Sequence, residues 1–159
     1  GWQVILAAET AAKTGSVEAT LDAIQRVRKN QALYCALSTM EFLRRSGRVG
    51  WAAAGIGALL QIKPLVQVVE GEVRAAARIR TFGKAVERLQ EFVREQGKLD
   101  RLAIIHSNNE EGARAMRESL KDVLPNDNNV IITRVGPTLG THIGPGGLGF
   151  ASVSATWKA

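Results

Sequence analysis

The stretch TFGKAVERLQEFVREQGKLDRLAIIH, residues 81–106, decides the expected fold. Thr81 can cap a helix whose apolar side chains share one face, namely Val86, Leu89, Phe92 and Val93. Gly97 ends this helical pattern, and residues 101–106 form the short apolar run typical of a buried strand. A helix followed directly by a buried strand indicates an α/β domain.

The flanking segments extend this alternation. Two β-rich runs, residues 64–69 and 73–79, are joined by Glu70-Gly71 and predict a hairpin. Further strands are expected at residues 33–37, 130–135 and 150–157. Helices are expected before Gly15, after a Ser16 cap, at 40–45 behind Thr39, and from Asn108 or Asn109 to a point before Pro125. The pattern predicts an α/β fold with a mixed sheet and flanking helices.

Composition narrows the class of protein. With 159 residues, 45% of them hydrophobic and 23% charged, the chain has the balance of one globular domain. The single cysteine, Cys35, cannot form an internal disulfide, so we interpret it as a small buried hydrophobe in a reducing compartment. The longest apolar stretch, residues 51–60, is too short to span a bilayer. We therefore expect a cytoplasmic protein with no signal peptide and no membrane anchor.

The formal charge of +6 comes mostly from the first half of the chain. Basic residues gather in three segments, 26–29, 44–48 and 74–80. The few aromatic residues are not interleaved with them as a base-stacking surface would require, so no nucleic acid partner is expected. A solvated basic face is the first interpretation, and docking of an acidic protein or an anionic ligand is the second.

Residues 136–149 are unusually rich in glycine, with six in fourteen positions. The match of residues 144–149 to GxGxxG is rejected, because a strand is expected after it instead of a helix. Thr141 and His142 are the side chains here that can bond a ligand strongly, and nearby backbone N–H groups could receive an anion such as a carboxylate. The alternative is that His142 braces a tight loop.

No catalytic or metal site is expected. His106, His142 and Cys35 lack metal-ligand spacing, and no nucleophile elbow or nucleotide-binding loop is present in the sequence. His106, at the end of an apolar strand, is interpreted as a hydrogen-bonded structural histidine. The sequence therefore predicts a protein that is not an enzyme and needs no cofactor.

Several segments together resemble the DegV family of bacterial fatty-acid-binding proteins. Residues 1–16 open two helices as in that family. Residues 38–49 are similar to the family segment that reads threonine-leucine and then leucine-lysine-lysine-glycine-glycine-arginine-isoleucine. Residues 57–65 are similar to its isoleucine-lysine-proline signature, and residues 140–146 to its glycine-rich histidine loop. Ser46 stands where the family usually has glycine.

The resemblance implies a carrier that holds a long-chain fatty acid between two domains. It also implies that the carrier presents the acid to a fatty acid kinase for lipid synthesis, without transferring the phosphoryl group itself. Family members are longer, and the resemblance covers their C-terminal part. Residues 1–30 would be the helical tail of the N-terminal DegV domain and a linker, and residues 31–159 the lipid-binding domain. The chain is then either part of a full carrier or a stand-alone domain.

The same resemblance assigns candidate ligand contacts by position. His142 would bond the fatty-acid carboxyl group, while Thr141 and the segment from Gly144 to Gly146 would shape the loop around it. Arg48 would lie near the headgroup or at the kinase-docking face. The candidates for acyl-chain contact are Ile56, Leu59, Leu60 and Ile62. The alternative function is a domain that docks a kinase, or the N-terminal half, and binds no lipid alone.

Overall fold

The computed structural model describes residues 1–47, 62–126 and 129–158. Its centre is a six-stranded sheet with the order β3-β2-β1-β6-β4-β5. The strands are β1 (Gln31–Ala36), β2 (Lys63–Val69), β3 (Glu72–Ile79), β4 (Leu99–His106), β5 (Val130–Arg134) and β6 (Leu148–Ser154). β4 and β5 are parallel, and the other neighbours are antiparallel. The expected mixed sheet is confirmed.

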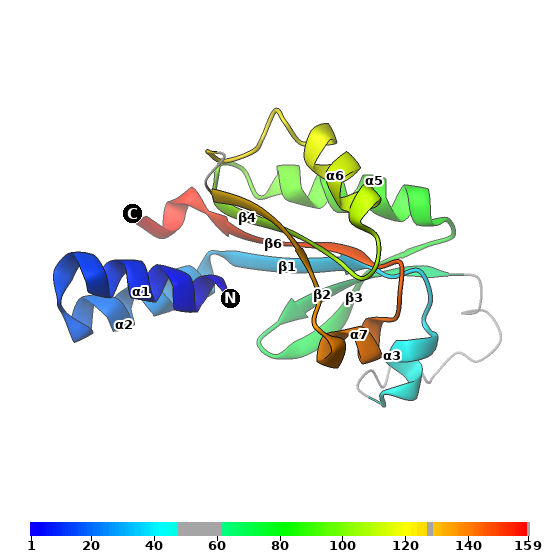
Figure 1. Cartoon of the computed structure of the whole chain (residues 1–159), viewed down its shortest axis with the longest axis horizontal. Helices are drawn as coiled ribbons and strands as arrows, with labels where there is room; N and C mark the ends of the chain where they lie inside the picture. The colour runs from blue at the N-terminus through cyan, green and yellow to red at the C-terminus, as the bar shows by residue number, and fades with distance from the viewer. Residues whose placement is uncertain (48–61, 127–128, 159) are drawn as a thin grey trace.

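The helices cover the two faces of the sheet unequally (Figure 1). The long helices α5 (Phe82–Glu95) and α6 (Glu110–Ser119) lie on one face. On the opposite face, the hairpin of α1 (Trp2–Thr14) and α2 (Val17–Lys29) lies at one end of the sheet. The short helices α3 (Glu41–Arg45) and α7 (Pro137–Ile143) lie at the other end. The second face is therefore covered at its ends.

The main core lies between the sheet and α5 and α6. Leu102 and Ile104 of β4 point to this side, where they pack with Leu89 of α5 and Met116 of α6. Tyr34 of β1 stacks between two aromatic rings, with centroids 4.7 Å from Phe92 and 5.4 Å from Phe150. These side chains bury the apolar helix faces that the sequence predicted.

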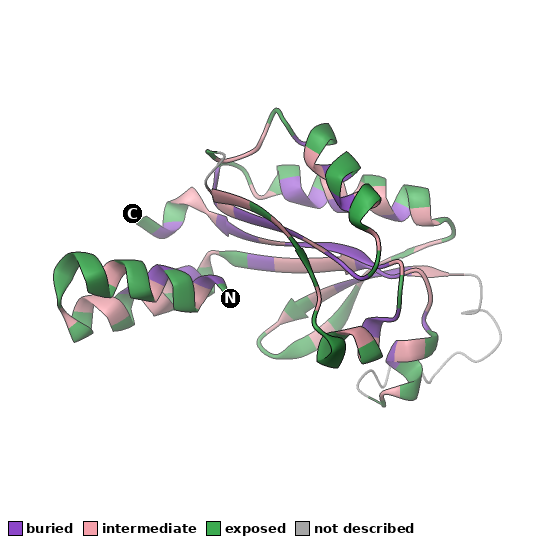
Figure 2. Cartoon of the chain, viewed as in Figure 1, coloured by how far each residue is buried: buried purple, intermediate pink, exposed green. Residues whose placement is uncertain are grey.

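The opposite face carries two smaller buried clusters. At the α1 end, Trp2 and Leu6 pack against Ala103 and Val153 of the sheet. At the α7 end, Leu37, Leu43 and Ile143 pack with Val66 and others. Figure 2 shows buried positions concentrated on the central strands and on the helix sides that face them. Between the two clusters, the sheet face is open enough to form the pocket described below.

Helix caps explain several element boundaries. The hydroxyl of Ser16 accepts a hydrogen bond from the Ala19 N–H at 3.2 Å, and that of Thr81 from Lys84 at 3.4 Å. Asn109 caps α6 in the same way, through the Gly112 N–H at 3.2 Å. The predicted starts of these three helices are confirmed.

Two expectations for the C-terminal segment differ from the structure. The glycine-rich stretch contains α7, because Pro137 suits a first helical turn and Gly144 ends the helix with φ +69°. The last strand ends at Ser154 and is followed by a 3-10 helix, η2 (Ala155–Lys158). The chain turns there because the Trp157 indole and the Lys158 ammonium both donate to Asp100, at 2.8 and 2.6 Å.

Across the described residues, none of the helices combines the length and the apolar character that crossing a membrane requires.

Candidate ligand-binding site

A pocket of about 320 Å³ opens on the second sheet face, beside α7. Its walls are almost entirely apolar and come from several strands and helices, among them Cys35 of β1, Val68 of β2, Ile105 of β4, and Leu139 with Ile143 of α7. His142, also on α7, brings an imidazole into this lining. Small-molecule sites have this combination of apolar walls and one or two polar groups.

The imidazole of His142 is one of the polar groups in the pocket lining, together with His106 and Ser107. Its Nδ1 atom is buried and has no hydrogen-bond partner among the described residues. A buried nitrogen without a partner costs free energy, about 1–3 kcal/mol, unless a ligand or water bonds it. A ligand with an apolar body and a polar end that reached this nitrogen would remove that cost.

The other residues predicted around the headgroup lie at different depths. Thr141 is exposed, and its hydroxyl donates to the Thr138 carbonyl at 2.8 Å within α7. Gly144 and Gly146 lie in the loop between α7 and β6, both with positive φ, +69° and +81°. The structure thus brings His142 to the pocket and leaves Thr141 on the solvent side of its helix.

The loop of residues 144–147 is held firmly. Ser107, directly after β4, donates its hydroxyl proton to the Gly144 carbonyl and accepts the Gly147 N–H at 3.0 Å. From the other side, the Ser38 hydroxyl donates to the Pro145 carbonyl at 2.6 Å. The Phe42 ring packs on Gly144 so closely that a Cβ there would lie 2.2 Å from its Cδ2 atom. Position 144 therefore requires glycine.

The remaining predicted contacts lie at or outside the limits of the described chain. Arg48, Ile56, Leu59 and Leu60 are outside the described residues. Ile62 is half-buried immediately before β2. Its neighbour Lys63 donates to the Ser38 carbonyl at 2.6 Å and so ties the start of β2 to the segment after β1.

Cys35 and His106, the other two side chains that could react, lie in surroundings that suit a structural role. Burial raises the pKa of the Cys35 thiol to about 12, so this pocket-lining side chain stays neutral near pH 7. His106 is buried, and its Nδ1 accepts the Asn109 N–H at 3.2 Å. The interpretations of Cys35 as a small apolar filler and of His106 as a hydrogen-bonded strand-end residue fit these surroundings.

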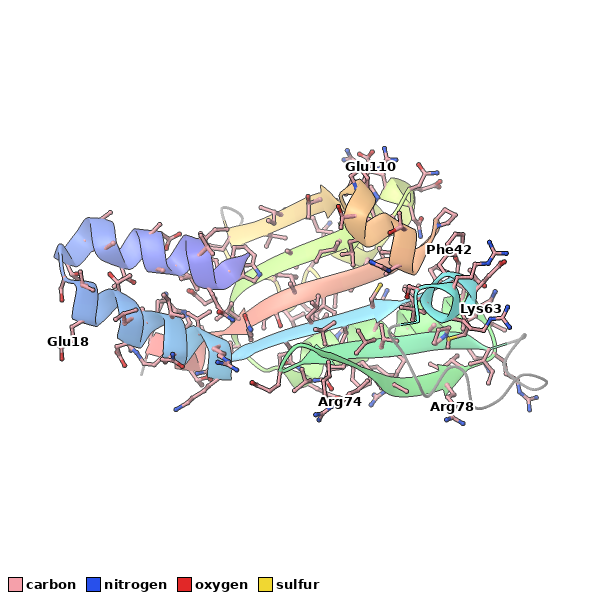
Figure 3. The ribbon with its side chains drawn as sticks, turned by 90° about the horizontal axis from the view of Figure 1, so that it is seen from below. Glu18, Phe42, Lys63, Arg74, Arg78 and Glu110 are labelled. Atoms are coloured by element: carbon pink, nitrogen blue, oxygen red, sulfur yellow. The ribbon has the colours of Figure 1, made fainter. Side chains whose placement is uncertain are left out.

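A second hollow of about 600 Å³ lies on the same face, at the α1 end. It shares Leu33, Val68 and Ile105 with the pocket beside α7, so the two form one trough along the sheet. The lining at the α1 end is mixed, because polar side chains such as Gln31, Gln67 and Ser152 join the apolar ones there. Figure 3 looks onto this face, with α1 and α2 at one end and α7 and α3 at the other. Large side chains remain exposed along it, including Val4 at 72% and Ile131 at 43%.

Sequence reasoning missed the residues that hold the loop. Ser107 and Asn109 follow a predicted strand, and Ser38 follows another. All three therefore lie at the same end of the sheet, where they bond the loop next to His142. The available signal was their position directly after apolar strands, where polar side chains often serve a site.

Known proteins resemble this chain along nearly all of its length. The model of the DegV family, described as uncharacterised, matches residues 1–155. A DegV domain-containing protein of Deinococcus radiodurans is 36% identical over 155 residues, which cover 95% of this chain and 54% of that protein. The protein SCO2569 of Streptomyces coelicolor is 33% identical over 151 residues, covering 94% of this chain and 54% of its own length.

Solved structures share the fold. A DegV family protein of Thermus thermophilus, described for its fatty acid binding, aligns with a TM-score of 0.84 and 34% identity over 97% of this chain and 56% of its own. The fatty acid binding protein SAG1342 of Streptococcus agalactiae gives a TM-score of 0.85 and 27% identity, with coverages of 97% and 55%. The chain spans about half the length of the curated relatives that it matches.

Proposed function

The chain belongs to the DegV family, and we propose that it holds a long-chain fatty acid in the trough between α7 and α1. The observation that carries this proposal is the apolar pocket lined by His142, whose Nδ1 atom has no hydrogen-bond partner among the described residues. Relatives of known structure that bind fatty acids support it.

The chemistry of a fatty acid suits both parts of the trough. An acyl chain gains about 0.8 kcal/mol for each methylene that it removes from water. The apolar residues along the sheet face, such as Leu33, Val68 and Ile105, offer that environment. A carboxyl group cannot enter an apolar pocket without a partner, and the imidazole of His142 supplies one.

The finer assignments are part of the same proposal. Thr141, Gly144 and Gly146 would shape the loop beside the carboxyl group, with Arg48 near the headgroup. Further acyl-chain contacts would come from the segment before β2, at Ile56, Leu59, Leu60 and Ile62.

We also propose a setting for this binding domain. A partner domain, the N-terminal DegV domain of a full-length carrier, would cover the trough, which explains why large apolar side chains lie exposed along it. Residues 1–30 would connect to that domain, and residues 31–159 would hold the lipid. The carrier would present its fatty acid to a fatty acid kinase in the cytoplasm and perform no catalysis itself.

The exposed basic residues support docking of an acidic partner. Arg74 and Arg78 on β3 point away from the sheet in Figure 3, and Arg44 and Arg45 of α3 are exposed. Arg74 pairs with Glu72 and Arg45 with Glu41, which offsets part of this charge. Their charge would attract an acidic protein surface. If this domain bound no lipid alone, docking through this surface would be the alternative function.

Native mass spectrometry of the purified chain, followed by solvent extraction, separates the two functions. A bound fatty acid in one-to-one ratio supports the carrier, whereas a lipid-free chain that also fails to take up added palmitate contradicts it. His142→Ala should weaken palmitate binding by about tenfold, the equivalent of one lost hydrogen bond. Leu21→Ala, an exposed position on α2, is the matched control and should leave binding unchanged.

A further inference from the structure

We propose that Ser107 is a positioning residue for His142. Ser107 holds the C-terminal end of α7 through the loop of residues 144–147, and thereby fixes the direction of the His142 imidazole. This inference rests on the proposed function only for its consequence in ligand binding. The hydrogen bonds of Ser107 support the positioning role by themselves.

Ser107 makes four hydrogen bonds to one short loop. Its hydroxyl bonds the Gly144 carbonyl and the Gly147 N–H. Its own N–H donates to the Gly147 carbonyl at 3.0 Å, and its carbonyl accepts the Gly146 N–H at 2.6 Å. The residue is 5% exposed, so water does not compete effectively for these bonds. The loop is thereby fixed to the end of β4.

Helix α7 depends on this attachment. It has seven residues, too few to form a stable helix by itself, and most of its residues are exposed. Its buried anchor is Ile143, which is followed directly by Gly144, the residue that Ser107 bonds. His142 lies one residue before that anchor, so a shift of the loop moves the imidazole.

Ser107 and His142 also line the same pocket. The Ser107 hydroxyl is committed to the loop by its two hydrogen bonds, one donated and one accepted, whereas the Nδ1 atom of His142 has no partner in the described part of the chain. This division of roles separates a residue that supports the site from one that can bond a ligand.

Ser38 provides the matched control. Its hydroxyl also bonds this loop, at the Pro145 carbonyl, but the contact is exposed and does not reach Gly144. Ser38→Ala therefore removes one loop hydrogen bond without releasing the residue next to Ile143. A general loss of loop stability would appear in both variants, whereas displacement of His142 would appear in the Ser107 variant.

The test uses the two histidines of the chain as NMR probes. The imidazole signals of His142 are assigned with His142→Asn, in the absence and the presence of palmitate. Ser107→Ala should shift or broaden the His142 signals of the unliganded protein and raise the palmitate Kd about fivefold to tenfold, as expected for a displaced hydrogen-bond partner. Ser38→Ala should leave both close to the wild type.

The positioning role is overturned if the His142 signals of Ser107→Ala match those of the wild type, or if Ser38→Ala changes them equally. A wild-type chain that does not bind palmitate would contradict the proposed function, but its His142 signals would still decide the role of Ser107. If Ser107→Ala does not fold, Ser107→Cys keeps the side-chain shape with a weaker donor, and its His142 signals should move in the same direction.

Discussion

Replacing Gly144 by alanine should damage both the stability of the protein and its binding site. The added Cβ would lie 2.2 Å from Cδ2 and 2.5 Å from Cε2 of the Phe42 ring. The backbone at this position has φ +69° and ψ −179°, a combination that glycine alone adopts readily. Steric overlap and backbone strain therefore act together in Gly144→Ala.

The two contributions can be given magnitudes. The backbone strain of a non-glycine residue in this region costs about 1–3 kcal/mol. Overpacking against a ring that must move costs a further 1–3 kcal/mol, roughly. We expect the free energy of unfolding to fall by about 3 kcal/mol, within the range that the strain and the overpacking give together.

A double-mutant cycle separates the contributions. Phe42→Ala removes the ring that the new Cβ would meet, so Gly144→Ala in that background should retain the backbone cost and lose the steric one. The coupling between the two substitutions should be favourable, about 1–3 kcal/mol. Urea unfolding followed by tryptophan fluorescence measures all four stabilities, because Trp2 and Trp157 are buried in the folded protein.

Palmitate binding provides the functional measurement on the same variants. Because Gly144 follows Ile143 directly, a displaced loop should also weaken binding at His142. The reasoning is refuted if Gly144→Ala unfolds within about 0.5 kcal/mol of the wild type, the level of an ordinary surface substitution. A coupling energy near zero would refute the steric part alone.

Three further predictions concern Asp100, Ser16 and Cys35. Burial alone would raise the pKa of Asp100, but hydrogen bonds from Lys158 and Trp157 and the charge of Arg101 hold it below its ordinary value. Its contribution to stability should therefore be present above about pH 4, the range of an unfolded carboxyl group, and disappear as the pH falls through the lower folded pKa. Urea unfolding of Asp100→Asn should show a smaller acid dependence. Ser16→Ala should cost about 1 kcal/mol in the same assay through loss of the α2 cap. Cys35 should react slowly with N-ethylmaleimide below pH 10, since its pKa is about 12, and bound palmitate should slow the reaction further; unchanged labelling with palmitate would contradict its place in the pocket.

Sequence patterns predicted the fold well where local chemistry decides it. The apolar face of residues 82–95 and the caps at Ser16, Thr81 and Asn109 are local signals, and the structure places helices accordingly. The hairpin through Glu70 and Gly71 is equally local, with both residues at positive φ. The family resemblance drawn from sequence is confirmed by the match over residues 1–155.

Long-range contacts account for what was not predicted. The turn into η2 depends on Asp100, which lies 57 residues before Trp157. The support of the α7 loop comes from Ser107 and Ser38, which are distant from it in sequence. A glycine-rich segment reads as a loop because its stability as a helix comes from these tertiary contacts and not from its own residues.

The position of the trough follows from the connections between strands. Helix α5 joins β3 to β4, and α6 joins β4 to β5, and both lie on the same face of the sheet. A connection through a helix covers the face on which the helix packs, so the described connections leave the other face to the terminal hairpin and two short helices.

The strands nevertheless carry apolar side chains on both faces. In β4, Leu102 and Ile104 pack under the long helices, while Ala103 and Ile105 line the trough. A strand that is apolar on both sides is characteristic of a sheet covered on both sides. The chain itself, in its described part, supplies that cover fully on one face. The remaining apolar surface is therefore where the proposed carrier would place an acyl chain and a further domain.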